Sequence, residues 1–70
     1  MNLSQPMRTA LYRASLPQFG GVMTMAENTG EALYRRGLVR WVWGYQYELT
    51  EAGWEEARRE AERGRSVSGL

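Results

Sequence analysis

The side chains best suited to recognition chemistry lie between residues 28 and 40. Asparagine and arginine form bidentate hydrogen bonds with base edges, and threonine and tyrosine commonly bind phosphates. All four types occur on a predicted helix that ends at Arg36, and one more arginine follows it. The residues that we expect to contact double-stranded DNA are Asn28, Thr29, Tyr34, Arg35 and Arg40. DNA binding with transcriptional control is therefore the leading functional hypothesis.

The same helix has a second interpretation, as a polar face that merely meets solvent. Glu31 lies among the expected contacts and would oppose close approach to phosphates, although its carboxylate could accept a hydrogen bond from cytosine. The sequence leaves these two interpretations open.

Aromatic residues form a second candidate site at a predicted turn. The site comprises Trp43, Tyr45 and Gln46, and Arg40 is the only cation nearby. Exposed aromatic side chains often mark protein interfaces, where tryptophan and tyrosine dominate the binding energy. The rival hypothesis is thus a module that binds, and inhibits, a host protein through this turn. Packing of Trp43 and Tyr45 on Phe19 is the alternative that needs no partner.

The composition excludes the common catalytic centres. The chain has no cysteine, histidine or aspartate, so the usual triads and metal sites lack their residues. The pair Gly20-Gly21 has neither the spacing nor the lysine of a phosphate-binding loop. We expect a protein that is not an enzyme and that holds no cofactor and no metal.

Residues 31–53, EALYRRGLVRWVWGYQYELTEAG, must position both candidate sites. Gly37 is predicted to end a helix in the left-handed conformation, with arginines at the carbonyl end. A hairpin centred on Gly44, with a loop of about three residues, follows. Thr50 is expected to cap the next helix. Alternation then places four residues on one face of the hairpin, with the two aromatic ones in the core: Val39, Trp41, Tyr47 and Leu49.

Two phrases in this stretch resemble those of the winged helix-turn-helix family. They are Arg36-Gly37-Leu38-Val39, at the end of the recognition helix, and the segment 47–53, YELTEAG, which closes the wing. The resemblance implies an α+β winged-helix-like domain of about three helices with a two- to three-stranded wing. It also implies DNA as a partner. The family's second helix is shortened here, because the segment 17–30 contains three glycines and a proline.

The first thirty residues predict one complete helix and the start of a second. Ser4 is expected to cap a helix that ends near Ser15 and buries Met7, Leu11 and Ala14, with Leu3 and Ala10 beside them. Val22 is expected to begin a short strand that pairs with the wing. Thr24 and Glu27 have the spacing of a capping box, which permits a helix from Met25 that runs through Gly30. We favour instead a short turn and a helix that starts at about Thr29.

The last predicted helix runs from Thr50 to Gly64, with a thin apolar stripe of Trp54, Ala57 and Ala61. This stripe can dock one or two turns of the helix on the body of the domain. Its small alanines would also let a second copy approach closely, so we expect a homodimer. Residues 1–64 would form one domain, and residues 65–70 a disordered tail.

Length and charge agree with a small regulator. Seventy residues build a core worth only about 3–5 kcal/mol. Residues 1–47 carry five arginines and two glutamates, whereas residues 48–70 carry four arginines and six glutamates. The basic half suits a polyanion, although its excess is modest. The absence of lysine favours a GC-rich bacterial or phage origin. The lack of cysteine, of a signal peptide and of a long apolar segment predicts a cytoplasmic protein without membrane contact.

Overall fold

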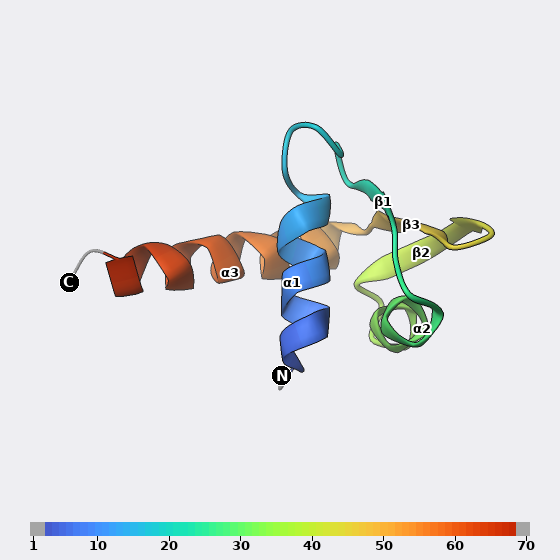
Figure 1. The fold of residues 1–70 in the computed structure, drawn as a ribbon, viewed down its shortest axis with the longest axis horizontal. Helices are drawn as coiled ribbons and strands as arrows, with labels where there is room; N and C mark the ends of the chain where they lie inside the picture. Colours follow the sequence, from blue (N-terminus) through green and yellow to red (C-terminus); the bar gives the residue numbers. More distant parts are fainter. Residues whose placement is uncertain (1–2, 69–70) are drawn as a thin grey trace.

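The computed structural model describes the backbone of residues 3–68 and the side chains of residues 3–63. Its elements are α1 (Gln5–Ala14), β1 (Val22–Thr24), α2 (Glu27–Arg35), β2 (Val39–Trp43), β3 (Gln46–Leu49) and α3 (Glu51–Ser68). The strands form one antiparallel sheet in the order β1-β3-β2 (Figure 1). The predicted α+β, winged-helix-like architecture of three helices and a three-stranded sheet is confirmed.

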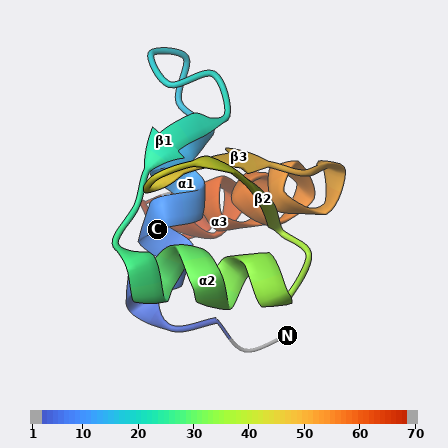
Figure 2. The same cartoon turned by 90° about the vertical axis from the view of Figure 1, so that its right-hand side faces the viewer.

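The helices meet the sheet at different places. Helix α2 runs beneath the β2–β3 hairpin, whereas α1 packs against α3 at the other end of the sheet (Figures 1 and 2). The far end of α3 extends beyond α1, away from the hairpin (Figure 1). The hairpin and α2 therefore lie at one end of the molecule, where α2 also contacts α1 and β1 pairs with β3.

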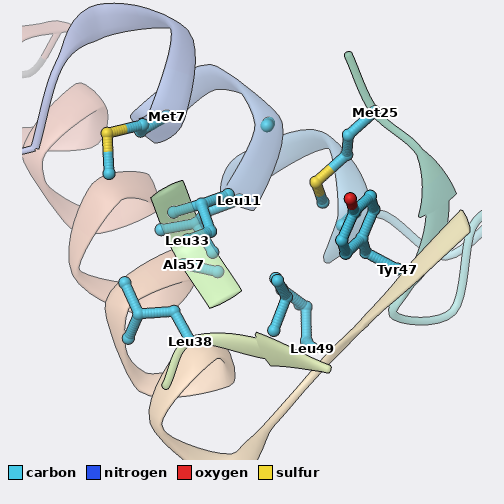
Figure 3. Close-up of a cluster of buried hydrophobic side chains, with 11 residues drawn as sticks. Met7, Leu11, Met25, Leu33, Leu38, Tyr47, Leu49 and Ala57 are labelled. Carbon is cyan, nitrogen blue, oxygen red and sulfur yellow. The ribbon is translucent and has the colours of Figure 1, made fainter. Parts of the chain in front are cut away.

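Helix α1 follows its predicted pattern. The Ser4 hydroxyl accepts a hydrogen bond from the Met7 amide at 3.4 Å, and the helix ends at Ala14. Its apolar stripe is buried and meets Leu33, Leu49 and Ala57 from the other elements (Figure 3). The buried members of the stripe are Met7, Ala10, Leu11 and Ala14.

Both predicted boundaries around the hairpin are confirmed. Gly37 has a φ of 74° directly after the C-cap of α2, and Gly44 has a φ of 56° in the hairpin turn. The Thr50 hydroxyl accepts from the Gly53 amide at 3.2 Å and donates to the Gly37 carbonyl at 2.6 Å. Thr50 thus caps α3 and joins its start to the end of α2. The turn itself is shorter than predicted, because β2 includes Trp43 and leaves Gly44 and Tyr45 as the loop.

The prediction for the start of α2 was wrong. The helix begins at Glu27 and continues without a break through Gly30. The capping box is not formed, because Thr24 belongs to β1 and Ala26 is the N-cap. Between β1 and α2 the described residues form no separate helix, and only the link Met25-Ala26 joins the two elements.

Gly30 lies inside α2 at a position where no other residue fits, because a neighbouring ring leaves no room for a side chain. A Cβ atom there would overlap the ring of Tyr47, which is buried on β3. The loss of helix propensity at a glycine, about 1 kcal/mol, is therefore offset by close packing of an aromatic ring on the helix backbone.

Helix α3 is longer than predicted. It ends at Ser68 and not at Gly64, so residues 65–68 of the predicted tail have a helical backbone. Residues 69 and 70 of that tail lie outside the described part of the chain. Within the described part, no helix has the combined length and hydrophobicity that crossing a membrane requires.

Replacement of Gly30 by alanine tests the contact with Tyr47. We expect Gly30→Ala to lower the free energy of unfolding by about 1 kcal/mol or more, because overpacking costs about 1–3 kcal/mol and exceeds the gain in helix propensity. Urea denaturation followed by circular dichroism measures the change. In a Tyr47→Leu background the same replacement should cost less. Stabilisation of the otherwise unchanged domain by Gly30→Ala would show that this packing is not tight.

Candidate partner-binding surface

Four large apolar side chains of the hairpin are exposed, and the register places Trp41 and Trp43 on opposite faces of it. Trp43 is 65% exposed and Tyr45 is 58% exposed, and neither is covered by Phe19, which is itself 40% exposed. We call the cluster of Trp41, Val42, Trp43 and Tyr45 the aromatic wing. The pairing of Trp41 with Tyr47 and of Trp43 with Gln46 leaves Val42 as an extra residue in β2, which forms a bulge in the strand.

Trp41 was predicted to lie in the core, and this is wrong. It pairs with buried Tyr47 across the strands, as the alternation requires, but it is 58% exposed. The α2 backbone at Gly30 covers Tyr47 on the central strand, whereas Trp41 on the outer strand β2 lines an open groove beside the same helix. The Trp41 indole N–H donates to the Gly44 carbonyl at 2.9 Å, so the ring is tied to the turn.

A groove lies between α2 and the hairpin, where Trp41 faces the helix. Glu27, Glu31 and Tyr34 line it from α2, and Trp41 and Tyr47 line it from the strands. The three helix residues follow at intervals of four and three, so they share one face of α2. Sequence reasoning missed the groove, because the contribution of Glu27 and Trp41 depends on how far α2 lies from the edge of the sheet.

The five residues predicted to contact DNA lie on four separate surfaces. Asn28 and Arg35 are exposed together on the outer side of α2. Thr29 is half-buried and lines a groove against α1, whereas Tyr34 lines the groove toward the hairpin. Arg40 lies on the sheet and pairs with Glu48. Of the five residues, the structure therefore brings together only Asn28 and Arg35.

The arginines near the wing have acidic or carbonyl partners. The Arg35 guanidinium lies 2.7 Å from a Glu31 carboxylate oxygen, and that of Arg40 lies 3.4 Å from Glu48. Arg36 donates to the Ala32 carbonyl at 3.1 Å. Because each ion pair cancels locally, this end of the molecule offers little net positive charge to a polyanion.

The residues of the rival hypothesis are more closely grouped. Trp43 and Tyr45 are exposed at the tip, and Gln46 is half-buried next to them at the start of β3. The Tyr45 carbonyl accepts from the Met25 amide at 2.9 Å, which ties the turn to the link before α2. The tip is therefore an aromatic surface on a hydrogen-bonded support.

One residue of the stripe predicted for dimerisation belongs to the chain's own core. Ala57 is only 1% exposed and lies in the buried cluster, because α1 packs against α3 there. Trp54 is 39% exposed beside Gly21, and Ala61 is half-buried. Ala57 is therefore not available to a second copy, and the homodimer stays a prediction that rests on Trp54 and Ala61.

The part of the chain that the structure describes contains no group of three or more potential metal-ligating side chains. Comparisons of the chain with models of protein families, with curated proteins and with solved structures find no match. The chain's own surface is therefore the basis for its candidate function.

The burial of Ala57 leads to a prediction about stability. We expect Ala57→Glu to cost about 3 kcal/mol or more and largely to unfold the domain, because it forces a charge into a packed site. Ala52→Glu places the same side chain at an exposed position of α3 and should change the stability by less than about 0.5 kcal/mol. Thermal unfolding of both variants measures the difference. A folded Ala57→Glu protein with wild-type stability would contradict the assignment of Ala57 to the core.

Proposed function

We propose that this chain is a binding module that captures a partner protein through the aromatic wing. The observation that carries the proposal is the exposure of Trp41, Trp43 and Tyr45, each by more than half, on one hairpin. Exposed aromatic clusters are costly to hydrate and are enriched at the centres of protein interfaces. A regulator or inhibitor that acts by occupying a partner, in the cytoplasm, fits this surface better than an enzyme does.

The surface has the other properties that protein interfaces require. Tryptophan and tyrosine supply large contact areas with few rotatable bonds, so little conformational entropy is lost on binding. The Trp41 indole is already held by Gly44, and the turn is held by Met25. The ion pairs of Arg35 and Arg40 lie beside the aromatic wing, as polar groups do at the rim of an interface.

DNA binding is the second candidate, and one observation favours it. Asn28 and Arg35 are exposed together on the outer side of α2, the helix that corresponds to the recognition helix in the family resemblance. Against it stand the pairing of Arg35 with Glu31 and the absence of a cation from the hairpin tip, residues 43–46. A contact by Arg35 with DNA would first have to break that pair.

Truncation of Trp43 tests the proposed function. We expect Trp43→Ala to weaken partner binding by about 2 kcal/mol or more, which is roughly 30-fold in the dissociation constant, without unfolding the domain. Capture from a lysate of the source cells, followed by titration of the purified partner, measures the loss. Tyr12→Ala removes a comparably exposed aromatic ring from α1 and should bind normally. Equal binding by wild type and Trp43→Ala would contradict a wing-centred interface.

A titration with mixed-sequence duplex DNA separates the two candidates. If the proposal holds, fluorescence anisotropy should show no duplex binding at low salt. If DNA is the partner, binding should appear and fall by about 0.9 log units per log unit of salt for each phosphate contacted. Arg35→Ala should then weaken it, and Trp43→Ala should have little effect. Salt-dependent binding with this pattern of variants would replace the protein-binding proposal with the DNA-binding one.

A further inference from the structure

The groove between α2 and the hairpin combines carboxylates with aromatic rings. Glu27 and Glu31 line it on one side, and Tyr34, Trp41 and Tyr47 complete the lining. Carboxylates attract a cation, and the faces of tryptophan and tyrosine attract it through their ring quadrupoles. An uncharged apolar side chain would use only the rings, and an anion would be opposed by both glutamates.

The charge of the groove is negative in sum. Among the described side chains, no ion pair engages Glu27, whereas Glu31 is paired with Arg35 at 2.7 Å. Counting that arginine, the groove and its rim retain one negative charge. The retained charge lies at Glu27, which faces the groove from the first turn of α2.

The groove is also built before a ligand arrives. Tyr47 is packed on the backbone of α2 at Gly30, and the Trp41 indole is held at 2.9 Å by the Gly44 carbonyl. A bound cation therefore would not have to order these two rings, which lowers the entropic cost of binding.

We propose that this groove receives an arginine side chain of the partner protein. The inference rests on the proposed function and specifies the chemistry of the partner beside the aromatic wing. Arginine fits better than lysine, because its planar guanidinium stacks on aromatic faces and donates to a carboxylate through two parallel N–H groups. The Trp41 and Tyr34 rings supply the faces, and Glu27 supplies the acceptor.

A matched pair of peptides tests the groove without the natural partner. The probe is a blocked pentapeptide with one arginine between glycines, and its control carries citrulline, which has nearly the same shape and no charge. Nuclear magnetic resonance follows the indole N–H of Trp41 during titration to millimolar concentrations. We expect the arginine peptide to shift this signal in a saturable way that weakens with salt, and the citrulline peptide to leave it unchanged. Equal shifts by both peptides, or no shift by either, would overturn the proposal.

Two variants, one of a carboxylate and one of an aromatic ring, show whether the peptide binds where the geometry indicates. Glu27→Gln should weaken the arginine peptide by about threefold or more, and Trp41→Leu should do the same when followed by the indole signal of Trp43. Glu55→Gln removes an equal charge from an exposed position of α3 and should leave the affinity unchanged. Should Glu27→Gln alter the fold, Glu31→Gln provides the second carboxylate test. Equal weakening by Glu27→Gln and Glu55→Gln would also overturn the proposal, because it would indicate attraction by net charge alone.

The two proposals fail in different ways. If Trp43→Ala loses the partner while Glu27→Gln binds both partner and peptide normally, the aromatic wing is the interface and the arginine site is wrong. If Trp43→Ala keeps the partner, the proposed function fails whatever the peptides do.

Discussion

The contact between Gly30 and Tyr47 determines how closely α2 packs against the sheet. Tyr47 lies on β3, the central strand, and its ring rests on α2 where Gly30 has no side chain. Figure 3 shows the same ring beside Met25, so it closes the core at the hairpin end. Any residue other than glycine at position 30 would push α2 away from the sheet. The groove between helix and hairpin would change with it, since Tyr47 is part of its lining.

The exposure of the aromatic wing follows from where this core ends. The pair Val39 and Leu49 is buried, the next inward pair is split into buried Tyr47 and exposed Trp41, and beyond it no helix covers the strands. A 70-residue chain has a small core, and burial of further aromatic rings would have stabilised it substantially. The hairpin instead extends these rings past the helices, where only a partner can remove them from water. Under the proposed function, this arrangement would sacrifice stability of the isolated chain for a contact surface.

Local signals in the sequence predicted most of the fold, and the errors arose where distant residues decide. The cap at Ser4, the left-handed Gly37 and the Thr50 cap depend on neighbours in sequence, and all three were confirmed. The helix was expected to start only at about Thr29 because the cost of Gly30 to a longer helix is local, whereas its compensation comes from Tyr47 on another element. Alternation placed Trp41 on the correct face of the hairpin. It could not show that α2 covers Tyr47 and leaves Trp41 in an open groove. Ala57 was assigned to a partner because the sequence does not reveal that α1 occupies that side of α3.

Contacts between distant residues also determine the net charge of the candidate surface. The spacing of Glu31 and Arg35 is visible in the sequence as an i,i+4 pair, but the pairing of Arg40 with Glu48 follows only from the register of β2 against β3. Exposed ion pairs of this kind add little to stability, typically less than about 1 kcal/mol. Their larger effect is on the field, because they neutralise two of the arginines from which DNA binding was predicted. What remains beside the aromatic rings is Glu27, so a face whose sequence suggests attraction to a polyanion becomes, once folded, aromatic and weakly acidic.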